Sequence, residues 1–134
     1  MYLTRDKIEW EKFLLPEGEG RVRENFHSGA EVIFVGKVRN HSNSKPVLYL
    51  EYEAYESMAE TLIGDLIVEA KKKWPVDEIK IGHRLGKVSL GEIAVWIEVH
   101  SAHRDESYQA SRFLIEEIKH KVPIWKKEYF EDGT

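Results

Sequence analysis

Hydrophobic residues recur along this chain with the spacing of strands in some segments and of helices in others. Residues 30–38 (AEVIFVGKV) are rich in β-branched and aromatic side chains, which predicts a largely buried strand. Residues 47–55 alternate between an apolar and a more polar face, as a half-buried strand does. Polar turn residues fill the interval 39–46. We therefore expect the two strands to pair as a long hairpin.

The next segment has the spacing of an amphipathic helix. Ser57 followed by Glu60 forms a capping box, which is a signal for a helix start. Lysines before Trp74 suit the negative end of a helix dipole, and Pro75 ends the helix. The predicted apolar stripe consists of Met58, Leu62, Leu66 and Ala70, flanked by Ile63 and Ile67.

Three more strands and a second helix complete the pattern. Residues 79–85, 92–100 and 122–130 are the predicted strands, and Ser101 is the expected N-cap of a helix that ends near Lys119. The side chains of this helix expected to point inward are Ala110, Phe113, Leu114 and Ile118. The order ββαββαβ predicts an α+β fold with a mainly antiparallel sheet and two principal helices on one face. We expect residues 1–134 to form a single domain.

Composition and charge narrow the classes of function. Of the 134 residues, 42% are hydrophobic and 33% are charged, which is typical of a globular domain. A net charge of −4 provides no broad basic field for nucleic acid or for a membrane, so any anion site must be local. Charges in Met1–Lys12 and the lack of a long apolar run favour a cytoplasmic protein with no signal peptide or membrane helix.

Cysteine is absent from the chain. Disulfides, thiolate zinc sites, iron–sulfur clusters and a cysteine nucleophile are therefore excluded. His100 and His103 lie close in sequence, but no third metal ligand is evident beside them, so we expect no metal site. His83 falls on the apolar face of its strand and is expected to be a hydrogen-bonded core histidine.

Three basic clusters fall at the ends of predicted elements. They are Lys37–Arg39, His103–Arg104, and Lys119 with Lys126, Lys127 and Glu128. Strand-end lysines are usually solvated, and lysines near a helix C-terminus meet the negative end of the dipole. His103 and Arg104 oppose the dipole in a first helical turn, where free N–H groups beside them suit a phosphate or carboxylate. By alternation, Lys126 shares a face with Glu128, and Lys127 points the other way.

Four segments resemble signature segments of the molybdopterin synthase large-subunit family. They are GAEVIFVGKVRNHS (29–42), LEYEAYESMAE (50–60), SAHR (101–104) and IKHKVPIWKKE (118–128). The similarity runs from about Gly29 to Gly133 in the family's order and spacing, and residues 1–28 are a divergent N-terminal segment. Four motifs in register make the match specific.

The resemblance implies an α/β-hammerhead fold and a homodimer, which forms a heterotetramer with two copies of a small ubiquitin-like sulfur-carrier subunit. The C-terminal thiocarboxylate of that subunit supplies sulfur to cyclic pyranopterin monophosphate, and the product is the dithiolene of molybdopterin. The large subunit then binds no cofactor of its own. Delivery of sulfur by a partner agrees with the absence of cysteine here.

Matching positions in the family imply the site residues. The implied catalytic residues are Lys119 and Lys126. The implied substrate-binding residues are Lys37, Val38, Arg39, His103, Arg104, Lys119, Lys126, Lys127 and Glu128. His103 and Lys119 lie near opposite ends of one predicted helix, about 24 Å apart at about 1.5 Å per residue. We therefore expect a composite site, in which His103 and Arg104 of one protomer meet Lys119 and Lys126 of the other.

Three other interpretations stay open. One is a non-catalytic α+β module that binds an acidic ligand or protein tail through the same cations, and turnover would distinguish it from an enzyme. Another is a ferredoxin-like RNA-binding domain, against which the acidic net charge and the lack of an aromatic RNP-like run argue. The last is a lysine-dependent Schiff-base enzyme, which borohydride trapping with a carbonyl substrate would expose.

Overall fold

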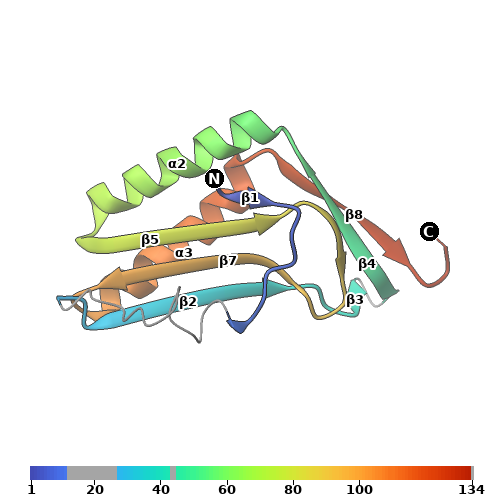
Figure 1. Cartoon of the computed structure of the whole chain (residues 1–134), viewed down its shortest axis with the longest axis horizontal. Coiled ribbons are helices and arrows are strands. Elements are labelled where there is room, and N and C mark those ends of the chain that lie inside the picture. The colour runs from blue at the N-terminus through green and yellow to red at the C-terminus, as the bar shows by residue number, and fades with distance from the viewer. Residues whose placement is uncertain (12–26, 43–44, 134) are drawn as a thin grey trace.

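The computed structural model of the chain describes residues 1–11, 27–42 and 45–133 (Figure 1). In chain order, the elements are β1 (Leu3–Thr4), β2 (Ala30–Lys37), β3 (His41–Ser42), β4 (Lys45–Ala54), α2 (Glu56–Lys73), β5 (Val76–Arg84), β6 (Gly86–Ser89), β7 (Ile93–Ser101), α3 (Arg104–Lys121) and β8 (Ile124–Phe130). The predicted order ββαββαβ is present, with the short strands β1, β3 and β6 in addition. Neither α2 nor α3 is apolar enough over its length to cross a membrane.

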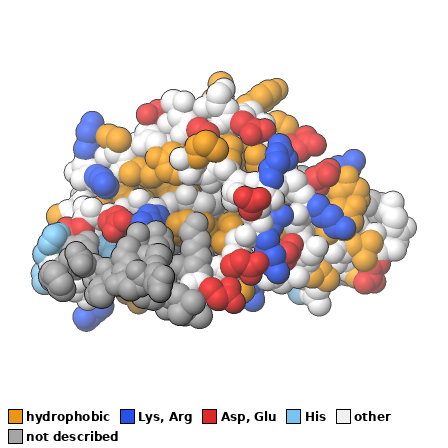
Figure 2. Space-filling model, viewed as in Figure 1, with side chains coloured by type: hydrophobic (Ala, Val, Ile, Leu, Met, Phe, Trp, Pro, Cys, Tyr) orange, Lys and Arg blue, Asp and Glu red, His pale blue; other side chains and the backbone are white. Residues whose placement is uncertain are grey.

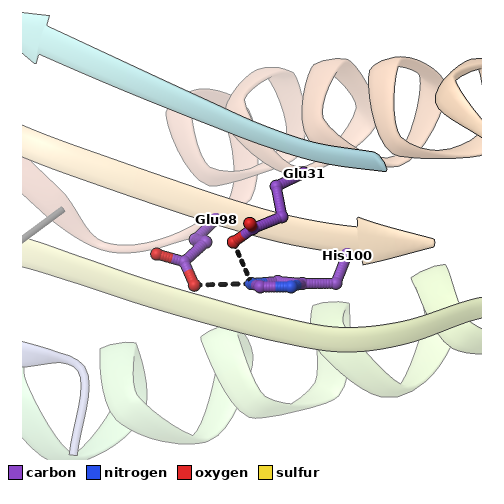
Figure 3. Close-up of side chains that lie close together, drawn as sticks. All are labelled: Glu31, Glu98 and His100. Carbon is purple, nitrogen blue, oxygen red and sulfur yellow. Dashed lines mark hydrogen bonds and ion pairs between the residues drawn. The ribbon is translucent and has the colours of Figure 1, made fainter. Parts of the chain in front are cut away.

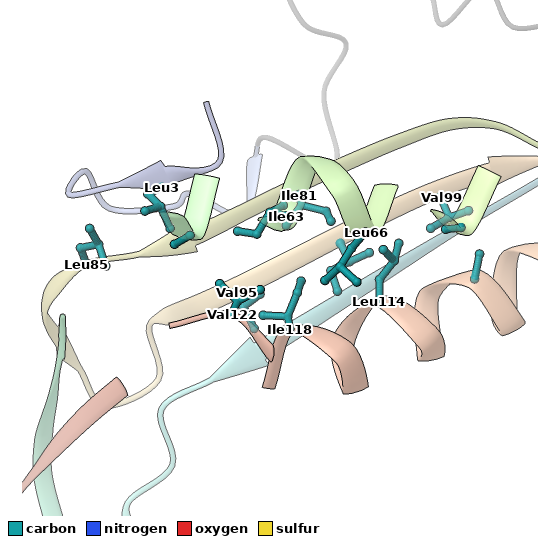
Figure 4. Packing of buried hydrophobic residues seen from close by; sticks show 14 residues of the cluster. Leu3, Ile63, Leu66, Ile81, Leu85, Val95, Val99, Leu114, Ile118 and Val122 are labelled. Carbon is teal, nitrogen blue, oxygen red and sulfur yellow. The ribbon is translucent and has the colours of Figure 1, made fainter. Parts of the chain in front are cut away.

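The larger sheet has the order β1-β5-β7-β2, and only its β1–β5 pair is parallel. One face of this sheet packs against α2 and α3, and their apolar side chains form the main core (Figure 4). Ile97 and Leu114 are fully buried in that core. Every residue of β7 is buried, because this strand lies between two neighbours and is covered on both faces.

The smaller sheet is built around β4, which pairs with β3, β6 and β8. The predicted hairpin between residues 30–38 and 47–55 is wrong, because β2 pairs with β7 and β4 belongs to the other sheet. The register of β2 shifts between Gly36 and Lys37, at the point where the chain leaves the larger sheet. The two sheets therefore meet where β2 ends, which brings segments distant in sequence to one place (Figure 1).

The predicted capping box of α2 does not form. Tyr55 is the N-cap and its side chain makes no capping hydrogen bond. The carboxylate of Glu60 instead accepts hydrogen bonds from the backbone N–H groups of Tyr2 and Leu3, at 2.7 and 2.9 Å. A long-range contact that fixes the N-terminal strand thus replaces the local one. The apolar stripe is also shifted, because Met58 is exposed and Ala59 is buried in its place.

The second helix begins later than predicted. Its N-cap is His103, whereas Ser101 is the last residue of β7 and is fully buried. The Ser101 hydroxyl bonds the carbonyl of His103 and the hydroxyl of Ser107, so it joins the strand to the first turn of α3. The inward positions Ala110, Leu114 and Ile118 are buried as expected, and Phe113 packs partly buried against the same core.

On the opposite face of the larger sheet, the indole of Trp96 lies directly over Gly82. A Cβ atom on Gly82 would come within 2.0 Å of the indole Nε1, so any side chain there must displace Trp96, which is 5% exposed. We expect Gly82→Ala to lower the free energy of unfolding by about 1–3 kcal/mol. Urea unfolding measures this change.

Gly64→Ala is the matched control for that substitution. Gly64 lies in α2, and its nearest neighbour is the Tyr2 ring at 3.8 Å, which is ordinary contact. Because alanine favours helix, this variant is expected to gain about 0.5–1 kcal/mol. If the two variants are equally stable, the packing of the Trp96 indole does not require a glycine at position 82.

Candidate functional site

A cavity of about 610 Å³ lies where the two sheets and the end of α3 meet. Its walls come from β2, β3, β4, β5, β7, α3 and β8. The cationic side chains that line it are Lys37, Arg39, Lys119 and Lys126. Basic and acidic side chains are interspersed over the face shown in Figure 2, as expected for a chain with a net charge of −4. The convergence of cations on one cavity is therefore a local feature.

Two of these cations come from the C-terminal part of the chain. Lys119 lies in the last turn of α3, and Lys126 lies on β8 opposite Tyr52 of β4. Both are exposed. Glu128 lines the cavity on the same face of β8 as Lys126, whereas Lys127 does not line it and places its Nζ 5.2 Å from the ring centroid of Tyr129. The alternation predicted for this strand is therefore present.

The other two cations flank the end of β2. Lys37 and Arg39 line the cavity, and Val38 between them is buried in the small core of the second sheet. The Val38 N–H donates to the carbonyl of Glu92 at 3.1 Å, and the Val38 carbonyl accepts from Gly91 at 2.8 Å. Val38 thus anchors the segment while its neighbours reach the cavity. A contact between the Val38 side chain and substrate has no support from this placement, and its role stays a prediction.

His103 and Arg104 do not line the cavity. Both are exposed at the N-terminal end of α3, whereas Lys119 lies near the other end of the same helix. At about 1.5 Å per residue, the two ends are about 24 Å apart. Within one protomer, the cavity therefore brings Lys37 and Arg39 together with Lys119, Lys126 and Glu128. His103 and Arg104 lie far from it.

The cavity wall also contains polar residues that were not predicted as site residues, and two of them, Tyr52 and His83, form a pair. Tyr52 and His83 contact each other edge to face, with ring centroids 4.9 Å apart. Burial, and then the negative charge of Glu128, raises the pKa of Tyr52, so its phenol stays neutral. Burial lowers the pKa of His83, and the hydrogen bond to Arg84 opposes this only in part. Alternation placed His83 on the apolar face, but only the meeting of the two sheets brings it beside Tyr52.

A separate cluster lies on β2 and β7, away from the cavity. The Nε2 atom of His100 lies 2.6 Å from Glu98 and 3.2 Å from Glu31, and the three side chains point toward one another (Figure 3). His100 and Glu98 are 4% and 2% exposed. Their donor atoms, together with that of Glu31, lie within 4.8 Å of one another, a spacing that a metal ion fits. An imidazole N–H of His100 that donates to the two carboxylates accounts for the same short distances without a metal ion. His103 is not part of this cluster.

The Glu98 carboxylate is expected to contribute strongly to stability. Glu98→Ala leaves the buried His100 without its nearest partner, which costs about 1–3 kcal/mol of unfolding free energy. Glu116→Ala is the control, because its ion pair with Arg112 is exposed and worth about 0–1 kcal/mol. Chemical denaturation of both variants measures the difference. Equal losses would mean that the buried pair adds nothing beyond a surface ion pair.

Comparison with known proteins gives consistent matches. The family model described as MoaE protein matches residues 8–121, so it reaches into the segment 1–28. A molybdopterin synthase catalytic subunit from Halalkalibacterium halodurans is 48% identical over 107 residues, which cover 80% of this chain and 69% of that protein. The crystal structure of a molybdopterin synthase from Staphylococcus aureus matches with a TM-score of 0.84 at 40% identity, over 98% of this chain and 92% of that one.

A more distant relative shares the fold. A Helicobacter pylori chain, solved in a complex of subunits 1 and 2 of molybdopterin-converting factor, matches with a TM-score of 0.75 at 22% identity. The match covers 98% of this chain and 85% of that one.

The α+β fold with two sheets is that of the solved molybdopterin synthase structure, which places the chain in this class of enzymes. The chain belongs to the MoaE family of molybdopterin synthase catalytic subunits. It is therefore an enzyme subunit of molybdenum-cofactor synthesis. The family resemblance of the four motifs and the α+β fold class are both confirmed.

Proposed function

We propose that this chain binds cyclic pyranopterin monophosphate in the cavity between its sheets and directs the transfer of sulfur to it. The observation that carries this proposal is the convergence of Lys37, Arg39, Lys119 and Lys126 on one cavity. Guanidinium and ammonium groups hold phosphate through charge-assisted hydrogen bonds. A volume of about 610 Å³ suits a small-molecule ligand, for which pockets of about 300–1,000 Å³ are usual.

The chain has no cysteine to carry sulfur, which supports its delivery by a partner. We assign this role to the C-terminal thiocarboxylate of a small ubiquitin-like subunit, with two copies bound to a homodimer of this chain in the cytoplasm. The relatives are named catalytic subunits, which supports the existence of a further subunit. In this arrangement the chain needs no cofactor of its own.

In the proposed chemistry, Lys119 and Lys126 act on the reacting atoms, and the other residues of the cavity hold the substrate. Attack of the thiocarboxylate sulfur on the pterin side chain requires a proton donor and acceptor close by, and the acyl linkage to the partner must then be hydrolysed. Lys119 and Lys126 are placed to move protons or to stabilise the oxyanion that develops at the acyl carbon. Lys37, Arg39 and Glu128 line the same cavity and complete the binding set, whereas the role of Lys127, which does not line it, stays a prediction.

His103 and Arg104 join this site in the dimer. They are exposed, and α3 holds them about 24 Å from Lys119 of the same protomer, too far for one small substrate to touch both. Arg104 begins α3 and His103 is its N-cap, so both lie beside free backbone N–H groups that suit an anion. We propose that they meet the cavity of the second protomer, where the substrate phosphate or the tail of the partner supplies that anion.

The experiment that tests sulfur delivery compares two forms of the small subunit. One carries the C-terminal thiocarboxylate, and the matched control carries an ordinary carboxylate. Molybdopterin is expected to form from cyclic pyranopterin monophosphate only with the thiocarboxylate. No product from a folded chain that binds this form of the partner would favour a non-catalytic binding module, and product with the carboxylate form would show that the sulfur has another source.

A further inference from the structure

The wall of the cavity has two chemically distinct parts. Its cations lie on exposed residues at the ends of β2 and α3 and on β8. Its less exposed part contains the neutral polar side chains of buried His83 and half-buried Tyr52, beside apolar residues such as Val95 and Ile118. The cations account for an anionic group on the ligand. His83 is 7% exposed and lines the cavity apart from these exposed cations.

The hydrogen bond of His83 to the backbone fixes which ring nitrogen carries the proton. The Nδ1 atom lies 2.7 Å from the carbonyl oxygen of Arg84, and a carbonyl oxygen can only accept. Nδ1 therefore carries the hydrogen, and Nε2 of the neutral ring keeps its lone pair. Within the described part of the chain, no hydrogen bond reaches Nε2. His83 lines the cavity, and its Nε2 is thus a hydrogen-bond acceptor that the described residues leave without a partner.

The surroundings of His83 keep the ring neutral. Burial lowers the pKa of the imidazole, and Tyr52, which touches the ring, is itself uncharged because its own pKa is raised. The charged groups that face the same cavity are Lys37 of β2, Arg39, Lys119 of α3, and Lys126 and Glu128 of β8.

We propose that Nε2 of His83 accepts a hydrogen bond from an N–H group of the substrate's heterocyclic ring, so that His83 determines specificity for the pterin and the cations hold its phosphate. The inference rests on the proposed function, because it names the residue that recognises the heterocyclic ring of the same substrate. A site with a fixed, desolvated acceptor discriminates strongly against ligands that lack the matching donor. Deletion of the acceptor therefore affects recognition of the ring and leaves recognition of phosphate intact.

Calorimetric titration with two ligands tests this assignment. The probes are cyclic pyranopterin monophosphate and inorganic phosphate, and the variants are His83→Phe, His83→Gln and the control His27→Phe, whose side chain is 77% exposed. His83→Phe is expected to weaken binding of the pterin phosphate about tenfold or more and to leave phosphate binding unchanged. His83→Gln, which retains an acceptor oxygen, is expected to recover part of the loss.

Each contrary result has a separate meaning. His83 does not recognise the ring if folded His83→Phe binds the pterin phosphate as tightly as wild type. The same conclusion follows if the variant loses affinity for both ligands equally. If wild type fails to bind the pterin phosphate at all, the proposed substrate is wrong and this inference falls with it.

A second measurement needs no variant, in case the substitutions prevent folding. In nitrogen-15 spectra of the wild-type imidazole, the Nε2 resonance of His83 is expected to shift when the pterin phosphate binds, but not when inorganic phosphate binds. Nδ1 is expected to remain protonated throughout. An Nε2 resonance that the pterin phosphate leaves unmoved would overturn the proposal.

Discussion

Replacement of Lys119 by alanine is expected to lower the rate of molybdopterin formation by about 10²–10³-fold in a protein that remains folded. Lys119 is exposed in the last turn of α3, so its side chain contributes little to the core. It lines the cavity together with Lys126, and in the proposed mechanism these two side chains supply the positive charge or the proton to the reacting atoms. The loss should therefore appear in turnover while the thermal midpoint changes little.

Lys121→Ala is the matched control for this variant. Lys121 lies two residues further along the same helix, pairs with Glu117 at 3.3 Å and does not line the cavity. Its removal deletes an equal charge from the same helix end and is expected to leave the rate within about twofold of wild type, since surface pairs of this kind contribute about 0–1 kcal/mol. Similar rates for the two variants would remove Lys119 from the catalytic assignment.

A mixture of His103→Ala and Lys119→Ala protomers is expected to recover activity that neither variant has alone. In a mixed dimer, one composite site receives both substitutions and the other receives neither. With random exchange half of the dimers are mixed, so the recovered rate should approach about a quarter of that of wild type. This expectation depends on the placement of His103 at the opposite end of α3 from Lys119.

Subunit exchange is verified with two affinity tags, and the mixed dimer is purified through both. A sequential purification of this kind also raises the expected rate to about half that of wild type, because every dimer then has one intact site. No recovery in the doubly tagged dimer would mean that each site is built within one protomer. His103 and Arg104 would then need another role.

Local sequence patterns predicted the elements of this fold well, but not their partners. Strand alternation placed Lys126 and Glu128 on one face of β8, and helical spacing identified Leu114 and Ile118 as core residues. Both results follow from the fixed geometry of one element. The expected hairpin was wrong because strand pairing is a long-range choice, and β2 finds its partner in the buried strand β7.

The same distinction applies to caps and polar residues. Ser57 and Glu60 fit the capping pattern, but the Glu60 carboxylate accepts hydrogen bonds from the backbone of Tyr2 and Leu3 instead. A local sequence pattern cannot predict such a long-range contact. His83 was expected to be a core histidine with a hydrogen bond, and it is buried and bonded to Arg84. Its contact with Tyr52 depends on how the two sheets meet, so the sequence alone could not place it in the cavity.

The cavity between the sheets is the proposed substrate site, and the crystal structure of the dimer with bound cyclic pyranopterin monophosphate tests it most directly. We expect the phosphate to lie within hydrogen-bond distance of Arg39 or Lys126 of one protomer, with His103 or Arg104 of the second protomer beside the same ligand. Substrate bound outside this cavity would contradict the proposed site. Substrate bound in the cavity without any residue of the second protomer would contradict its composite nature.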